Sequence, residues 1–132
     1  MNNNELKKKL TAEEYRVTQE KGTEAPFSGS YIDHMLEGVY ACKVCGQVLF
    51  SSNTKLNSRS GPTGLQGWPA FDEALPGTIE YIDDKSMGMV RTEIVCSKCK
   101  SHLGHLFDDD TRTGKHFCTN SCALDFKKIK RL

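Results

Sequence analysis

The chain has 132 residues, 37% of them hydrophobic, and a formal net charge of +1. This length fits one domain, and the near-neutral charge excludes a general attraction to nucleic acid or to an anionic membrane. No run approaches the ~20 consecutive apolar residues of a membrane-spanning helix, and the N-terminus lacks the apolar stretch of a secretory signal. We therefore expect a single cytoplasmic domain over residues 1–132, with residues 1–9 as a flexible tail.

The clearest element near the N-terminus is a helix. Thr11 and Glu14 have the spacing of a capping box, in which each side chain bonds the backbone amide of the other residue. The helix is predicted to run from Ala12 to about Lys21 and to end at Gly22, because glycine commonly follows a helix C-terminus.

Beyond this helix, frequent Gly and Pro residues separate short runs that have strand character. Residues 51–67 are rich in Ser, Asn and Gly and are predicted to form a loop. The sequence therefore predicts a mainly β fold, with a small antiparallel β domain after a helical N-terminal segment. The predicted strands are residues 38–41, 48–50, 78–82, 89–95, 102–107, 116–120 and 123–129.

Four of the six cysteines form two Cys-x-x-Cys hooks, Cys42 with Cys45 and Cys96 with Cys99. Each hook follows a strand-like run, and a two-residue spacer lets a tight turn present two sulfurs to one ion. Because a tetrahedral zinc ion takes four thiolates, the hooks are predicted to share one structural zinc ion that clips two distant segments together. The alternatives are two redox-active dithiols or four buried free thiols.

Cys118 and Cys122 lie outside the hooks. If residues 116–120 form a strand, then His116, Cys118 and Asn120 project from one face of it. A thiol flanked by an imidazole and an amide can be held as a thiolate and can orient a polar substrate. The alternative is a buried core cysteine, and these residues alone do not decide between the two.

Two histidines, His102 and His105, follow the second hook with Gly104 between them. They would fall on opposite faces of a regular strand, but a bulge at Gly104 would bring both to one side. Such a pair can donate a proton and stabilise an oxyanion near pH 7. The alternative is that one histidine replaces a cysteine as a zinc ligand.

Two further motifs have an open interpretation. Trp68, the one tryptophan, lies in a Gly/Pro-rich loop and either walls a small apolar pocket or belongs to the core. The acidic run 108–110 forms either an acid cluster beside the histidines or a solvated turn.

Together these motifs resemble the type B methionine sulfoxide reductases, in order and over most of the chain. The matching segments include Tyr15–Glu24, Pro26–Gly29, Gly67–Phe71, Gly88–Glu93, Cys96-x-x-Cys99, His102–His105, Phe107–Asp109 and Phe117-Cys118-x-Asn120-Ser121.

The resemblance implies a mainly β fold of two antiparallel sheets in a barrel-like body, with short N-terminal helices and the four-cysteine zinc site. It also implies an oxidoreductase that reduces methionine R-sulfoxide, free or in oxidised proteins, and so repairs damage from oxidative stress. We expect no organic cofactor, a thioredoxin-like or other thiol reductant as partner, and a monomer.

By the same resemblance, Cys118 attacks the sulfoxide sulfur and becomes a sulfenic acid, while His102 and His105 hold and protonate the sulfoxide oxygen. The implied supporting residues are Asn120 for substrate positioning, Asp109 for orienting the cluster, Trp68 for receiving the methyl group, and His116 and Phe107 for the rest of the pocket.

The sequence departs from the family at two positions. Many members have an arginine two residues before the nucleophile, where this chain has His116, whose charge depends on pH. Many members also place a resolving cysteine two residues before the tryptophan, where this chain has Gln66. Cys122 is the remaining candidate, but it needs a bend after Asn120, because four extended residues span roughly 13 Å and a disulfide needs Cα atoms within about 7 Å. The alternatives are direct reduction of the sulfenic acid by an external thiol and recruitment of a zinc cysteine, which would threaten the fold.

A zinc-ribbon binding module without catalysis is the rival from another class. It explains the hooks but gives no reason for the two histidines, Cys118 and Asn120 together. A zinc hydrolase or deaminase is a second rival, but the chain has no His-x-Glu signature and the four-thiolate site has no open metal position.

Overall fold

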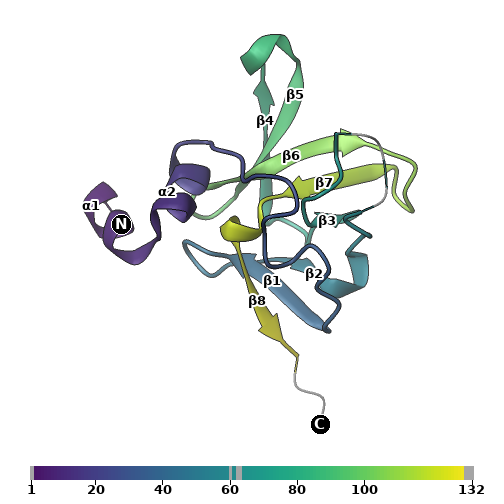
Figure 1. The fold of residues 1–132 in the computed structure, drawn as a ribbon, viewed down its shortest axis with the longest axis horizontal. Coiled ribbons are helices and arrows are strands. Elements are labelled where there is room, and N and C mark those ends of the chain that lie inside the picture. The colour runs from purple at the N-terminus through teal and green to yellow at the C-terminus, as the bar shows by residue number, and fades with distance from the viewer. Residues whose placement is uncertain (1, 60, 62–63, 130–132) are drawn as a thin grey trace.

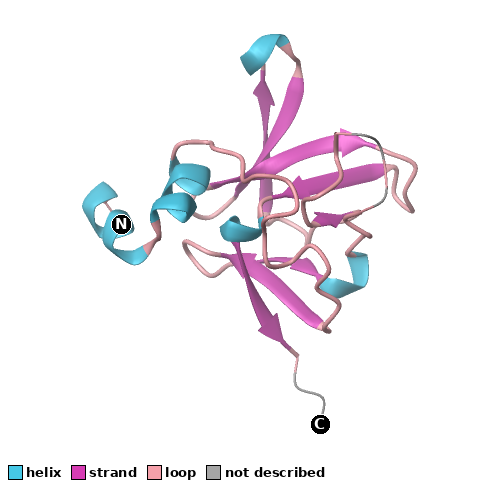
Figure 2. Ribbon diagram, viewed as in Figure 1, coloured by secondary structure: helices cyan, strands magenta, loops and turns pink. Residues whose placement is uncertain are grey.

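Two separate antiparallel sheets make up most of the computed structural model, which describes residues 2–59, 61 and 64–129 (Figures 1 and 2). The first sheet has the order β2-β1-β8, formed by β1 (Gly38–Cys42), β2 (Val48–Ser51) and β8 (Leu124–Lys128). The second has the order β3-β7-β6-β5-β4, formed by β3 (Ala70–Phe71), β4 (Ile79–Asp84), β5 (Arg91–Cys96), β6 (His102–Asp108) and β7 (Lys115–Thr119). The predicted mainly β fold with two antiparallel sheets is confirmed, and the barrel-like description holds only loosely.

In the described part of the chain, three short 3-10 turns interrupt the loops. They are η1 (Ser52–Thr54), η2 (Ser86–Gly88) at the tip of the β4–β5 hairpin, and η3 (Ser121–Ala123) between β7 and β8. The hairpin projects from the body of the molecule in Figure 1, whereas η3 contacts helix α2 (Ala12–Gln19).

Aromatic side chains join the two sheets. Phe50 on β2 and Phe71 on β3 are fully buried and stack with their ring centroids 4.3 Å apart. Tyr40 on β1 meets Phe71 edge-on, with a centroid separation of 5.1 Å. Because offset-stacked and edge-on aromatic pairs are favourable beyond their buried area, this cluster fixes one sheet against the other.

The N-terminal segment is more ordered than its composition suggests. Residues 1–9 were expected to be a flexible tail, but Asn3–Lys9 form helix α1, capped by the Asn2 side chain. Leu6 of this helix is 7% exposed and packs into the core, which explains the difference, because burial of one apolar side chain anchors a short helix. Met1 lies outside the described residues.

Helix α2 (Ala12–Gln19) carries the predicted capping box, with Thr11 and Glu14 bonding each other's backbone amides. The helix ends at Gln19, two residues earlier than predicted, and Lys21 adopts a left-handed φ of 58°. Its buried Val17 and its contacts with β6 and η3 bring the segment that follows it, residues 22–24, against the five-stranded sheet. Among the described residues, neither helix is long and apolar enough to cross a membrane.

Candidate active site and metal centre

The four hook cysteines form one cluster. The Sγ atoms of Cys42, Cys45, Cys96 and Cys99 all lie within 4.8 Å of one another, and the pairs Cys42–Cys99 and Cys45–Cys96 are both 3.6 Å apart. Cys42 ends β1 of one sheet and Cys96 ends β5 of the other, so the cluster joins the two sheets.

Both hooks are tight turns of the same kind. The Gly46 amide donates to the Cys42 carbonyl, and the Lys100 amide donates to the Cys96 carbonyl, each over 2.8 Å. The residue after each second cysteine is left-handed, with φ of 83° at Gly46 and 64° at Lys100. Gly46 therefore supplies the flexible backbone that the turn requires, and Lys100 takes the same conformation at the cost of local strain.

The geometry of this cluster fits a tetrahedral metal ion. Zinc–sulfur bonds of about 2.3 Å in a tetrahedron place neighbouring sulfurs about 3.8 Å apart, close to the two 3.6 Å separations. The crowded thiols share their protons unequally, because hydrogen bonds from its neighbours lower the pKa of Cys99, whereas those around Cys42 raise its pKa. Such a set of sulfurs is ready to exchange protons for a metal ion. Neither His102 nor His105 belongs to the cluster.

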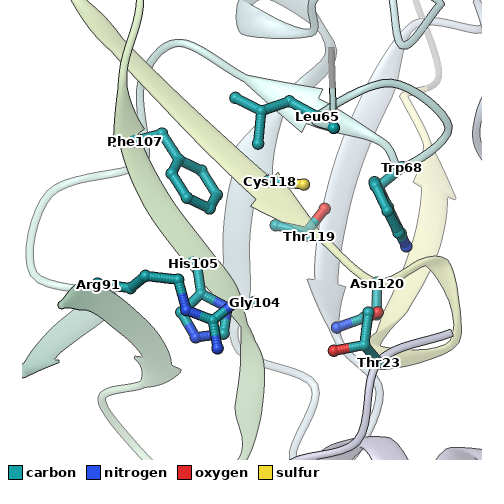
Figure 3. A pocket seen from close by; sticks show the side chains of 11 residues that line it. Thr23, Leu65, Trp68, Arg91, Gly104, His105, Phe107, Cys118, Thr119 and Asn120 are labelled. Carbon is teal, nitrogen blue, oxygen red and sulfur yellow. The ribbon is translucent and has the colours of Figure 1, made fainter. Parts of the chain in front are cut away.

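Cys118 lines a small pocket of about 90 Å³ on the five-stranded sheet (Figure 3). Figure 3 shows Leu65, Phe107 and Trp68 arranged around the Cys118 sulfur, with His105 and Arg91 at the other end of the pocket. The remaining lining residues are Thr23, Gly64, Gly104, Thr119 and Asn120. The pocket thus has apolar walls near the sulfur and cationic or ionisable groups beyond it.

Strand register brings Cys118 and His105 together. Cys118 on β7 pairs with His105 on β6 and with Ala70 on β3, and directly paired residues share one face of a sheet. Gly104 permits this approach, because a Cβ atom there would lie 1.9 Å from the Cys118 carbonyl oxygen. Glycine is therefore required at this position by the closeness of β7.

A β-bulge lies beside Gly104. In the β5–β6 ladder Ile94 pairs with Gly104 and Val95 pairs with His102, so Leu103 has no partner of its own. The bulge places the rings of His102 and His105 5.5 Å apart between centroids. A regular strand would place the two rings on opposite faces. A bulge that brings them together was expected from the glycine between the two histidines.

Each histidine has a carboxylate partner that sequence reasoning missed. Nδ1 of His102 donates to Glu93 Oε2 over 2.7 Å, and Nε2 of His105 donates to Asp84 Oδ2 over 2.8 Å. Glu93 stands on β5, next to β6, and Asp84 stands on β4, on the far side of β5, so only the strand pairing shows that they meet the histidines. Glu93 belongs to a segment that resembles the family, and this resemblance was the one sequence feature that could have identified it as a site residue.

The two histidines differ in their exposure to the pocket. His105 lines the pocket, whereas His102 is 3% exposed, does not line it, and has an Nε2 with no hydrogen-bond partner among the described residues. Burial lowers the pKa of His102, against the opposing effect of Glu93. Hydrogen bonds from Ser86 and then from His105 hold the pKa of Asp84 well below its usual range.

His116 and Asp109 form a separate pair. Nδ1 of His116 donates to Asp109 Oδ2 over 3.0 Å, and both residues line a neighbouring cavity of about 400 Å³ with Asn57 and Gly61. Asp109, which was expected to orient the histidine cluster, thus contacts His116, while Glu93 and Asp84 contact the cluster. His116, which was expected to help form the Cys118 pocket, lies on β7 two residues before Cys118 and lines this neighbouring cavity instead.

Asn120 and Trp68 are held by one buried residue, Glu24. Oδ1 of Asn120 accepts from the Glu24 amide, and Nε1 of Trp68 donates to the Glu24 carbonyl, each over 2.9 Å. Nδ2 of Asn120 donates to the Leu103 carbonyl over 3.0 Å, so both ends of its amide bond to backbone. Asn120 and Trp68 therefore have fixed orientations at the pocket wall, and Glu24 is a contributor that sequence reasoning missed.

The resting Cys118 thiol is protonated at neutral pH. Burial, followed by the negative charge of Glu24, raises the pKa of Cys118 to about 12. The sequence pattern indicated a flanking imidazole but gave no sign of this desolvation. A reaction at Cys118 therefore has to remove the thiol proton in the presence of substrate.

Cys122 and Gln66 lie outside the Cys118 pocket. Cys122 is in η3 and lines a different cavity, of about 380 Å³, and its amide donates to Glu24 Oε1 over 3.0 Å. Burial and the charge of Glu24 raise the pKa of Cys122 to about 12. Gln66 donates through Nε2 to the Gly61 carbonyl over 3.0 Å.

Comparison with known proteins agrees with this arrangement. The family model described as the SelR domain matches residues 10–128. Methionine-R-sulfoxide reductase B3, mitochondrial, of Mus musculus is 52% identical over 124 residues, which are 92% of this chain but 47% of the mouse protein. The peptide methionine sulfoxide reductase MsrB of a Synechococcus strain is 49% identical over 94% of this chain and 88% of its own. The MsrB of Leptospira interrogans is 48% identical over 92% of this chain and 90% of its own. The chain therefore belongs to the SelR domain family, that of the type B methionine sulfoxide reductases.

Proposed function

We propose that this enzyme reduces methionine R-sulfoxide to methionine, with Cys118 as the nucleophile. The observation that carries the proposal is the pairing of Cys118 with His105 in a pocket walled by Trp68 and Phe107. The apolar wall suits the methyl group of the substrate, and the imidazole suits the sulfoxide oxygen. Both protein-bound and free methionine sulfoxide are substrates under this proposal.

The reduction needs an acid as well as a thiol. A sulfoxide sulfur is electrophilic, but oxide is a poor leaving group. The sulfoxide oxygen must therefore be protonated as the Cys118 sulfur adds to the sulfoxide sulfur. In the net step the Cys118 thiol and the sulfoxide become Cys118 sulfenic acid and methionine, and the thiol proton ends on the transferred oxygen. A neutral, buried thiol suits this step, because its proton leaves only when the oxygen is ready to take it.

His105 is the group best placed to hold and protonate the oxygen. Its bond to Asp84 fixes the orientation of the ring, and it lines the pocket that holds Cys118. His102 lies behind it, with Nδ1 fixed by Glu93 and its Nε2 unpartnered among the described residues. We propose that His102 supplies or relays a proton to the same oxygen, as the sequence motif suggested.

The remaining predicted site residues support the pocket. Asn120 and Trp68 shape its wall, Phe107 lies beside the Cys118 sulfur, and Asp109 acts through its bond to His116. We propose that His116 influences the charge of Cys118 from the neighbouring cavity.

We propose that the metal held by Cys42, Cys45, Cys96 and Cys99 is one structural zinc ion. Four thiolates leave no open position on a tetrahedral ion, so when bound it would supply stability and no reaction chemistry. The cysteine residues themselves join β1 to β5, and an ion there would fix the five-stranded sheet that carries Cys118 against the three-stranded one.

The sulfenic acid is returned to thiol by external reductant. Two thiols, as in a thioredoxin-like protein, convert Cys118 sulfenic acid to the thiol and leave one disulfide and one water. Cys122 remains a candidate resolving residue, but its place in a separate cavity favours the external route. A single reductase domain, a monomer and a cytoplasmic location stay predictions.

Turnover of the two separate sulfoxide epimers with dithiothreitol tests the proposal. The R epimer is expected to be reduced and the S epimer not, and Cys118→Ser is expected to lower the rate by at least about a thousandfold, because the nucleophile is lost. Cys122→Ser is the matched control and is expected to retain turnover with this small reductant. Equal reduction of both epimers, or a Cys118→Ser variant that still turns over, would contradict the proposal.

A further inference from the structure

Glu24 lies between the two cavities that contain the cysteines outside the hooks. Its neighbour Thr23 lines the Cys118 pocket, and Glu24 itself lines the cavity of Cys122. Only 4% of Glu24 is exposed. A charged residue is seldom buried to this extent without a specific task, because removing a carboxylate from water is costly.

The main chain of Glu24 fixes the wall of the Cys118 pocket. Its amide donates to Asn120 Oδ1 and its carbonyl accepts from Trp68 Nε1, each over 2.9 Å. Both side chains line the pocket, and Figure 3 shows them on the side of Cys118 opposite Phe107. The position of this wall relative to the sulfur therefore depends on residue 24.

The carboxylate of Glu24 holds the turn that follows the Cys118 strand. Oε1 accepts from the Cys122 amide over 3.0 Å, at the start of η3. Oε2 is buried and has no hydrogen-bond partner among the described residues. It is closely enclosed, because a Cβ atom on Gly29 would come within 2.5 Å of it. One oxygen thus anchors the turn, and the other has no such bond to a described residue.

The carboxylate of Glu24 also acts on Cys118. It adds to burial in raising the pKa of the Cys118 thiol. The other charged or titratable groups of the pocket are Arg91 from β5 and His105 from β6. Glu13 and Glu14 from α2 and Lys43 line the cavity of Cys122, on the far side of Glu24.

We propose that Glu24 is a positioning residue for the reaction at Cys118: its backbone fixes Trp68 and Asn120, and its carboxylate anchors η3 and acts on the thiol through its charge. This inference rests on the proposed function of Cys118. In the resting enzyme burial holds the proton on the thiol and the carboxylate adds to this effect, which protects the thiol from alkylation and from oxidation before substrate arrives.

The test is the pH dependence of Cys118 alkylation by iodoacetamide in a Cys122→Ser background, with tandem mass spectrometry to locate the label. Glu24→Gln keeps an oxygen that can accept from the residue 122 amide but removes the charge. In Glu24→Gln the increase of the alkylation rate with pH is expected to occur about one pH unit lower than in the parent. Alkylation at a given pH is then about tenfold faster. Glu13→Gln is the control, because Glu13 lines the cavity of residue 122 and not the Cys118 pocket, and its profile is expected to match the parent.

Glu24→Asp separates charge from geometry. It keeps the charge but withdraws the carboxylate from η3, so its alkylation profile is expected to stay within about 0.3 units of the parent while kcat/KM falls about tenfold. A Glu24→Gln profile that coincides with the parent, or a Glu24→Asp variant with full kcat/KM, would overturn the proposal. Alkylation needs no turnover, so a failure of Cys118 as nucleophile would appear separately, as turnover that survives Cys118→Ser.

Discussion

Individual cysteines in this chain have different chemistry because their surroundings differ. The four hook thiols crowd within 4.8 Å of one another, which suits a metal ion. Cys118 instead stands apart in an apolar pocket, where burial raises the pKa of its thiol to about 12. The spacing of the cysteines predicted this division, but the protonation state of Cys118 needed the three-dimensional surroundings.

His116 gives a prediction at this scale. An arginine keeps its charge at all working pH values, whereas an imidazole loses its charge as pH rises through the neutral range. His116→Arg is therefore expected to favour the Cys118 thiolate and to shift the rising limb of the kcat/KM profile to lower pH. The cavity of about 400 Å³ beside His116 offers room for the longer side chain.

The measurement is the pH–rate profile of both proteins with methionine R-sulfoxide and dithiothreitol. Asp110→Asn, on the wall of the same cavity, controls for a change in local charge away from β7. Superimposable profiles for His116→Arg and the parent would show that residue 116 does not influence the nucleophile.

At the scale of the elements, much of the fold was predictable. The seven predicted strands correspond to β1, β2 and β4 to β8, because each is a short apolar or alternating run bounded by turn residues. The two-residue strand β3 was missed, since it lies in a Gly/Pro-rich loop and forms only through pairing with β7.

The carboxylates beside the histidines were missed for a related physical reason. Glu93 and Asp84 are remote from His102 and His105 in sequence and meet them only through the register of β4, β5 and β6. No pattern within a single strand encodes the register of its neighbours. The bulge was the exception, because Gly104 marks it directly in the sequence.

Gly104 gives the prediction at this scale. Gly104→Ala would place a Cβ 1.9 Å from the Cys118 carbonyl oxygen, so β6 and β7 must separate. The variant is expected to lose roughly 2–4 kcal/mol of unfolding free energy and most of its activity. Urea denaturation and turnover of the R epimer provide the two measurements.

Gly114→Ala is the matched control for this experiment. Gly114 lies in the turn that connects β6 to β7, has a φ of 79°, and has nothing within 4 Å of the added Cβ. Its cost is backbone strain alone, about 1 kcal/mol, and its activity is expected to persist. Equal losses in the two alanine variants would show that contact with β7 is not what requires glycine at residue 104.

At the scale of the whole molecule, the four-cysteine cluster and Cys118 occupy separate places on a shared frame. The hooks join the ends of β1 and β5, while Cys118 lies on β7 of the five-stranded sheet. The N-terminal segment completes the pocket from outside the sheets, through Thr23 and through the bonds of Glu24 to Trp68 and Asn120. A zinc-ribbon module without catalysis would have no need of this pocket.

Native mass spectrometry of the protein after a single turnover with methionine R-sulfoxide, without reductant, tests this separation most directly. The account predicts a chain that keeps one zinc ion and gains one oxygen atom, located by fragmentation at Cys118 and absent from Cys118→Ser. Loss of the metal ion on turnover, or oxygen found on a hook cysteine, would contradict it.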